Sequence, residues 1–227
     1  MAFGLREIII KRLRILVADD HDLIRRGVKT LLLSHAGWEV CGEAQTGREA
    51  VAKSNALKPD VVILEIGMPD LNGLEAARKI RKASANTEIL ILSMHQSDQL
   101  VREIVDAGVR GYLVKSDSDR DLIIAVETLG NHQPFFTPRV TEVILGCFNS
   151  GEPVKEVPDL IRERLTARER EIVQLLAEGK SSKEVASSLR IRVKTVETHR
   201  ANLMRKLEIH NVSEVVRYAV RNRIVEA

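Results

Sequence analysis

The sequence predicts an α/β domain built on a five-stranded parallel sheet, followed by a small domain made only of helices. Short apolar runs alternate with longer amphipathic runs from residue 13 to residue 130, whereas residues 165–225 show only helical periodicity. Between them, residues 131–159 hold four of the six prolines, a composition typical of a linker. We therefore expect domains at 12–130 and 162–227, joined by a linker with one short helix at 131–161.

The α/β part alternates strand patterns with helix patterns. The predicted strands span residues 13–18, 39–44, 60–65, 88–93 and 111–114. The predicted helices span residues 22–35, 47–57, 73–83, 97–107 and 119–130. This alternation predicts parallel strands with helices on both faces of the sheet. Right-handed crossovers leave few topologies, and the flavodoxin-like order 2-1-3-4-5 is the usual one for five strands.

The rest of the chain is predicted to be helical. A helix over 139–148 is ended by Ser150-Gly151, and Thr166 with Glu169 matches a capping box that opens the next helix. The predicted helices of the last domain span residues 167–178, 182–189, 194–207 and 213–222. The sequence thus predicts about four helices after the linker.

Composition limits the class of protein. The 227 residues contain no apolar run near 18 residues, and the start of the chain does not read as a signal peptide. Two cysteines, Cys41 and Cys147, form no disulfide framework or metal-binding spacing, so we expect reduced thiols and a cytoplasmic location. Residues 162–227 carry 15 Lys and Arg against 9 Asp and Glu, which points to nucleic acid as a partner of that part alone.

Chemically active side chains follow four of the predicted strands. Asp19 and Asp20 follow the first strand, Glu65 ends the third, Ser93 ends the fourth and Lys115 follows the fifth. The carboxyl ends of parallel strands share one edge of the sheet, and sites are built at that edge. Taken singly, the Asp pair reads as a helix cap, Ser93 as a strand-end hydroxyl and Lys115 as a surface charge.

Together these residues, with the Gly-Met-Pro and Asn-Gly of VVILEIGMPDLNGLEA, resemble the receiver domain of two-component response regulators. The resemblance covers roughly residues 12–130. It implies a Mg²⁺ site at Asp19, Asp20, Glu65 and the Gly67 carbonyl, because hard cations prefer oxygen ligands. It also implies that Lys115 and Ser93 hold a phosphoryl group and that Tyr112 is the aromatic switch residue.

Position 65 departs from that family. Its members have an aspartate there, which accepts a phosphoryl group from a sensor histidine kinase, and this chain has Glu65. The extra methylene moves the carboxylate about 1.5 Å further into the pocket. Its charge is about −1, against about −1.5 to −2 for a phosphate. We therefore expect a position that is not phosphorylated, or that mimics the phosphorylated state only in part.

The segment from Leu165 to Leu207 resembles the LuxR/NarL-type helix-turn-helix, and the match extends to about residue 222. Val196, His199, Leu203 and Leu207 share one face of the predicted recognition helix and should face the core. The opposite face presents the candidate base-reading residues Lys194, Glu197, Thr198, Ala201 and Arg205. The candidate phosphate-binding residues are Lys183, Thr195, Arg200 and Lys206.

Two positions depart from the helix-turn-helix pattern: Arg192 stands where a Ser or Thr cap is usual, and Glu208 where Gly is usual. The resemblance implies that the last helix forms the dimer interface on DNA, through Val215, Val216, Ala219 and Val220. The whole chain is thus identified as a NarL/FixJ-type response regulator, a transcription factor and not a metabolic enzyme. The resemblance implies promoter DNA, a cognate sensor histidine kinase and a second copy of the chain as partners.

Two other interpretations stay open. A locked receiver would act by protein contact, for example by sequestering a kinase, and would bind the kinase without binding DNA. A flavodoxin-like enzyme would need a cofactor loop, and the sequence has no Gly-rich phosphate-binding motif.

Overall fold

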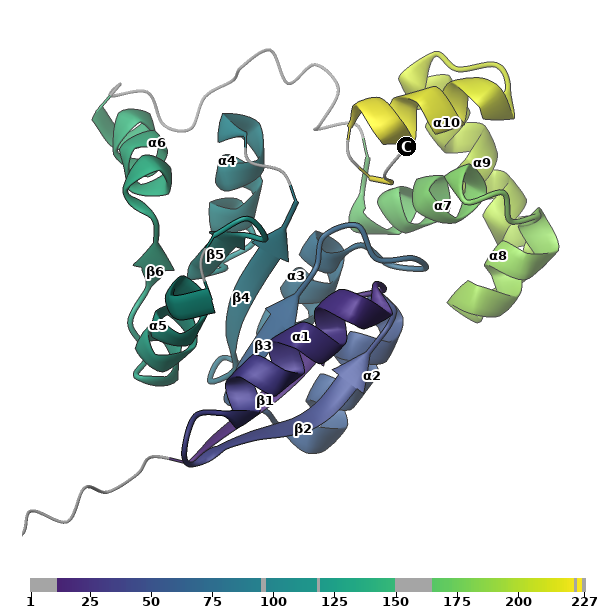
Figure 1. Cartoon of the computed structure of the whole chain (residues 1–227). Helices are drawn as coiled ribbons and strands as arrows, with labels where there is room; N and C mark the ends of the chain where they lie inside the picture. The colour runs from purple at the N-terminus through teal and green to yellow at the C-terminus, as the bar shows by residue number, and fades with distance from the viewer. Residues whose placement is uncertain (1–11, 95–96, 118, 150–164, 223, 226–227) are drawn as a thin grey trace, which may run out of the picture.

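The computed structural model describes residues 12–94, 97–117, 119–149, 165–222 and 224–225 (Figure 1). The end of the predicted linker (150–161) and the first residues of the predicted last domain (162–164) lie outside this part of the chain. The described residues form an α/β part up to residue 149 and a separate group of helices from residue 165. No helix within these described ranges is long and apolar enough to cross a membrane.

The sheet is parallel throughout and has six strands in the order β2-β1-β3-β4-β5-β6, whereas the sequence predicted five. The strands are β1 (Leu13–Ala18), β2 (Trp38–Ala44), β3 (Val61–Leu64), β4 (Glu88–Ser93), β5 (Gly111–Val114) and β6 (Phe135–Phe136). The predicted order of the first five strands is confirmed. The sixth strand lies in the predicted linker, and the sequence did not predict it. Two residues between prolines are too few to show strand periodicity, and pairing with β5 makes them a strand.

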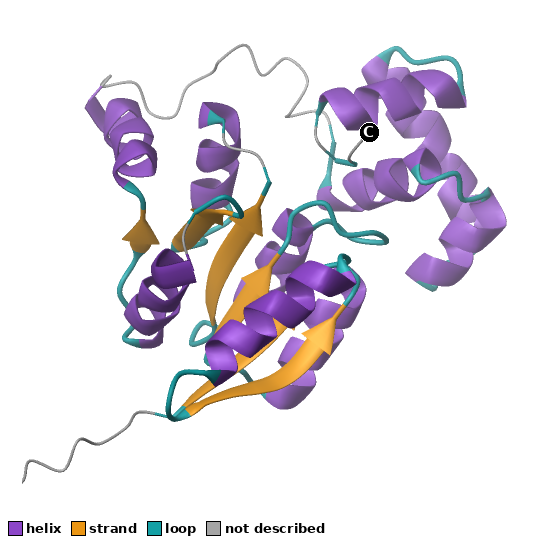
Figure 2. Ribbon diagram, in the orientation of Figure 1, coloured by secondary structure: helices purple, strands orange, loops and turns teal. Residues whose placement is uncertain are grey.

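Helices cover both faces of this sheet (Figure 2). The helices of the α/β part are α1 (Asp22–Leu33), α2 (Gly47–Leu57), α3 (Gly73–Ala83), α4 (Asp98–Asp106), α5 (Asp119–Gly130) and α6 (Pro138–Asn149). Apolar residues of α2, α3 and α4 pack with one face of the sheet, and those of α1 and α5 pack with the other. The linker helix α6 buries Val140 against the first of these layers, so it extends the α/β part.

The last helices have a core of their own. They are α7 (Ala167–Ala177), α8 (Ser182–Leu189), α9 (Val193–Leu207) and α10 (Val212–Arg221). The predicted capping box of Thr166 and Glu169 is confirmed, and Ser181 with Glu184 forms a second one at α8. Arg192 makes no side-chain cap at α9.

Glu208, at the end of α9, adopts a left-handed conformation with φ of 56°. A residue with a Cβ atom pays about 1–2 kcal/mol for that conformation, which explains why glycine is usual in the family at this helix end.

Candidate functional site

The acidic pocket lies at the carboxyl ends of β1, β3 and β5. Glu65 directly follows β3, and its backbone N–H donates to the carbonyl of Ala18 at the end of β1 (2.9 Å). Asp19 follows that same strand, and Lys115 follows β5. Asp19 and Glu65 are both buried. The parallel sheet therefore brings together three residues that are 46 to 96 positions apart in the sequence.

Both carboxylate oxygens of Glu65 are engaged. Oε1 accepts hydrogen bonds from the backbone N–H groups of Ile66 (2.7 Å) and Gly67 (3.2 Å). Oε2 forms an ion pair with Nζ of Lys115. The carboxylate thus takes up donors that could otherwise hold an anionic group in this pocket. Gly67 contributes its N–H here, whereas the resemblance implied a role for its carbonyl.

Lys115 is shared between two acids. Its Nζ lies 2.7 Å from Oδ2 of Asp19 and also contacts Glu65, and only 6% of its side chain is exposed. Burial acts against the lysine charge, but the hydrogen bonds and charges of Asp19 and Glu65 outweigh it and raise the pKa of Lys115. Burial raises the pKa of Glu65, and Lys115 with the two backbone N–H groups offsets this only in part. One lysine therefore balances two buried carboxylates incompletely.

One group of side chains could hold a metal, and it includes Asp19 and Asp20 of the predicted set. Among the described residues, ligand atoms of Asp19, Asp20 and His21 lie within 4.8 Å of one another, and Glu65 is not in this group. His21 Nδ1 lies 2.9 Å from Oδ1 of Asp20, and the His21 N–H donates to Oδ1 of Asp19 (2.8 Å). Glu65 lies outside this group and pairs with Lys115, which also contacts Asp19. The sequence signal for His21 was its place directly after the Asp pair.

Ser93 and Tyr112 lie on the adjacent strands β4 and β5. Ser93 is the last residue of β4 and is buried. Tyr112, on β5, is opposite Ile91 in the strand register, and its side chain is fully buried in the core. The Ser93 carbonyl accepts from the N–H of Lys115 (2.8 Å), which ties the ends of β4 and β5 together.

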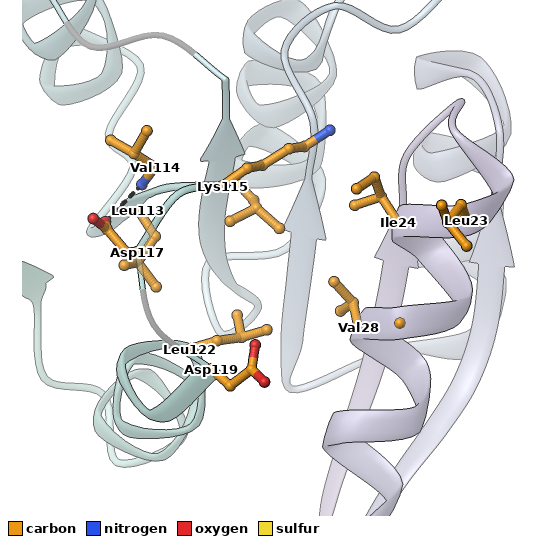
Figure 3. A pocket seen from close by; sticks show the side chains of 11 residues that line it. Leu23, Ile24, Val28, Leu113, Val114, Lys115, Asp117, Asp119 and Leu122 are labelled. Atoms are coloured by element: carbon orange, nitrogen blue, oxygen red, sulfur yellow. Dashed lines mark hydrogen bonds between the residues drawn. The ribbon is translucent and has the colours of Figure 1, made fainter.

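An apolar hollow opens beside this pocket, between α1 and α5. Its volume is about 200 Å³, and its lining includes Val28, Leu113 and Leu122 together with Asp119. Figure 3 shows Lys115 at its rim. Leu23, on α1, also lines it and is 82% exposed. The sequence gave no signal for this hollow, because it depends on how α1 and α5 meet over the sheet.

The outward face of α9 is accessible. The candidate DNA-binding residues Lys194, Thr195, Glu197, Thr198, Ala201 and Arg205 are exposed, as is Lys183 on α8, and Arg200 is partly exposed. Val196 and Leu203 are buried in the domain core. Lys206 is exposed as well, and its Nζ lies 2.7 Å from both carboxylate oxygens of Glu169, while its contact with a phosphate stays a prediction.

The predicted dimer surface on α10 is smaller than expected. Val215 and Ala219 are completely buried in the domain's own core, so they are not available to a second copy of the chain. Val216 and Val220 are only partly buried and remain candidates. The sequence pattern could not separate the two pairs, because all four residues are apolar and closely spaced on one helix.

Known proteins match both parts of the chain. Residues 15–127 match the response regulator receiver domain, and residues 163–219 match the bacterial regulatory proteins of the luxR family. The chain is 35% identical to the response regulator protein VraR of Staphylococcus aureus over an alignment of 214 residues. This alignment covers 94% of this chain and 99% of that protein. The chain therefore belongs to the LuxR-type response regulators of two-component systems.

Solved structures show the same fold. The response regulator ChrA of a heme-sensing two-component system is 28% identical, with a TM-score of 0.50 over 94% of this chain and 99% of that one. A LuxR-family response regulator from Aurantimonas sp. SI85-9A1 is 30% identical, with a TM-score of 0.57 over 63% of this chain and all of that one. RcsB of Salmonella enterica serovar Typhimurium, bound to promoter rprA, is 22% identical with a TM-score of 0.58, over 92% of this chain and 98% of that one.

Proposed function

We propose that this response regulator is a sequence-specific DNA-binding transcription factor whose receiver works without phosphorylation at position 65. The observation that carries this proposal is the Glu65 carboxylate, which accepts from two backbone N–H groups and pairs with Lys115. These are donors of the kind that bind a phosphoryl group, and here they bind a carboxylate instead. Its single charge makes any mimicry of phosphate partial.

DNA binding is supported by the helix-turn-helix. The outward face of α9 is exposed, and it combines the carboxylate of Glu197 with the hydroxyl of Thr198 and the long cation of Arg205. Such side chains read base edges in a major groove. We propose that two copies bind two half-sites of promoter DNA, as helix-turn-helix dimers do. The RcsB structure on promoter DNA shows that a protein of this fold binds a promoter.

A magnesium ion fits the pocket through Asp19 and Asp20. Mg²⁺ is usually bound by one or two carboxylates and keeps several waters, which matches this pair of adjacent acids. Oδ2 of Asp19 is shared with Lys115, so we expect the binding to be weak. Bound there, the cation would supply charge to offset phosphoryl oxygens at the carboxyl edge of the sheet.

The test combines DNA binding with intact mass. The protein and its Glu65→Asp variant are compared in a DNA-binding assay, each with and without a small phosphodonor and Mg²⁺. We expect no phosphoryl adduct and no response to the phosphodonor with Glu65, and both with Glu65→Asp. An adduct on the protein that carries Glu65 would contradict the proposal.

A second function is favoured by the apolar hollow between α1 and α5. Leu23 is exposed beside this hollow, so a partner protein could contact both. A receiver locked by Glu65 could then hold its sensor kinase without passing on a signal. Binding of the kinase in the absence of any sequence-specific DNA binding would favour this function over the first.

A further inference from the structure

The loop that follows Glu65 contacts the DNA-binding domain directly. We name residues 66–72 the acceptor loop; they connect β3 to α3 (Figure 1). The loop lies against α7, the first helix of the helix-turn-helix domain, through hydrogen bonds that span 102 to 108 positions of sequence. The described contacts between the two domains thus include the loop next to the acceptor position.

Gln174 of α7 bridges the acceptor loop. Its Oε1 accepts from the N–H of Asn72 (2.8 Å), and its Nε2 donates to the carbonyl of Met68 (3.0 Å). Gln174 is buried, with 2% of its surface exposed. A buried side-chain amide with both ends bonded to loop backbone fixes the loop to the helix, since losing either bond would leave a buried polar group unpaired.

Asp70, at the tip of the loop, makes a second set of contacts with the DNA-binding domain. Its N–H donates to Oε1 of Glu178 (3.0 Å), and its carboxylate forms an ion pair with Lys180. Asp70 adopts a φ of +65°, a conformation that an L-residue adopts only when its surroundings stabilise it. The contacts from the end of α7 provide that stabilisation.

Charged pairs flank the bridge. Glu171 of α7 is buried and pairs with Lys79 (2.7 Å) and Arg48 (3.2 Å) of the receiver. With the charges reversed between the domains, Arg170 of α7 pairs with the buried Glu75 of α3 (3.4 Å). The docked geometry is therefore specified by complementary charges of both signs.

The other end of the loop is held by position 65. Oε1 of Glu65 fixes the N–H groups of Ile66 and Gly67, and the N–H of Gly73 donates to the carbonyl of Ile66 (2.9 Å). A Cβ atom on Gly73 would lie 2.0 Å from the carbonyl oxygen of Glu65, so this turn has no spare room. A short loop fixed at both ends passes a displacement at one end on to the other.

We propose that the acceptor loop couples the side chain at position 65 to the docking of the DNA-binding domain, with Gln174 as the residue of α7 that responds to the loop through its two hydrogen bonds. The proposal rests on the proposed function for its meaning in regulation. The docked arrangement leaves the outward face of α9 exposed, so the loop sets the orientation of the domain without covering its DNA face.

Hydrogen exchange of the full chain, without DNA, tests the coupling in both directions. Glu65→Ala removes the acceptor of the loop N–H groups, and we expect exchange to rise about fivefold in the acceptor loop and also in α7 around Gln174. Glu88→Ala is the matched control, because Glu88 is an equally buried, ion-paired carboxylate at the opposite edge of the sheet. It should leave α7 unchanged.

The reverse direction uses Gln174→Ala, since a coupling between two sites must be reciprocal. We expect faster exchange at the N–H groups of Ile66 and Gly67, which donate to Glu65 and not to Gln174. Lys180→Ala is a second, milder variant expected to act in the same direction. Its control is Lys206→Ala, which breaks a Lys–Glu pair inside the DNA-binding domain.

A response of α7 to Glu65→Ala together with a response of residues 66–67 to Gln174→Ala supports the coupling. If Glu65→Ala loosens only the loop, the coupling is wrong. It is also wrong if Glu88→Ala changes α7 as much as Glu65→Ala does, or if Lys206→Ala changes residues 66–67 as much as Gln174→Ala does. Failure of the proposed function is separate, because it is measured as loss of sequence-specific DNA binding by the unaltered protein.

Discussion

Lys115 should be among the most important single side chains for the stability of the receiver. The perturbation is Lys115→Met, which keeps an unbranched apolar stem and removes the ammonium group. It leaves Asp19 and Glu65 buried, each with 3% of its surface exposed, and takes away the cation they share. Removing one partner of a buried ion pair costs about 3–5 kcal/mol, because an uncompensated charge stays in the interior.

This cost is a large part of the free energy of unfolding of an ordinary domain, which is about 5–15 kcal/mol. With a urea dependence of about 2 kcal/mol per M, the unfolding midpoint should fall by about 2 M. Adding Glu65→Gln to Lys115→Met removes one of the two buried carboxylates that have lost their cation, and should recover a substantial part of the lost free energy of unfolding. The magnitude thus follows from two carboxylates that depend on one lysine.

Urea unfolding followed by the fluorescence of Trp38 measures this effect on the receiver alone. Trp38 is the only tryptophan of the chain and is buried at the start of β2. Lys29→Met is the matched control, since Lys29 pairs with Glu43 at the surface and such pairs contribute about 0–1 kcal/mol. A loss below about 1 kcal/mol for Lys115→Met, or no recovery by Glu65→Gln, would refute the reasoning.

Three further outcomes are expected. Millimolar Mg²⁺ should raise the thermal stability of the receiver and Asp20→Asn should abolish the effect; no change in either protein would mean that the metal site is not formed. Glu197→Ala should relax the sequence preference of DNA binding by about 1–3 kcal/mol at one base pair. Lys183→Ala should weaken the affinity for all DNA sequences alike and make the dependence of affinity on salt shallower by about one unit. A binding-site selection with the reverse pattern would contradict both roles. Burial acts to raise the pKa of Glu171, but Lys79 and the neighbouring arginine outweigh burial and lower this pKa in the docked form. Glu171 therefore stabilises docking at pH values above its ordinary pKa of about 4.3, and this contribution is lost as the pH falls through the lowered pKa. The radius of gyration from small-angle scattering should therefore rise on acidification and be raised already at neutral pH in Glu171→Gln, and an equal pH response in both proteins would rule this out.

The sequence by itself determined most of the elements. Alternation of apolar strands with amphipathic helices is a local pattern, and it predicted the helix Gly47–Leu57 and the strand Glu88–Ser93 with the bounds that the structure has. Residues at strand ends could also be assigned to one edge of the sheet, because parallel strands place their carboxyl ends together. Asp19, Glu65 and Lys115 were brought to one pocket by that rule alone.

Only the tertiary structure decided which partner each of these side chains takes. The sequence predicted Glu65 as a metal ligand, which stays a prediction, and only the structure shows that Glu65 also pairs with Lys115 and with the N–H groups of Ile66 and Gly67. The sequence predicted that Lys206 contacts a phosphate of DNA, and only the structure shows that Lys206 also pairs with Glu169. The choice depends on distances of a few ångströms between residues far apart in the chain, and periodicity does not contain them.

The contact between the domains belongs to the same class. Gln174 and the acceptor loop carry no motif that links them, and they lie more than a hundred positions apart. β6 likewise becomes a strand only through its neighbour β5. Local propensity and periodicity fix where helices and strands form, because these depend on neighbours in sequence. Hydrogen bonds and ion pairs between elements depend on packing, and the folded chain alone sets that geometry.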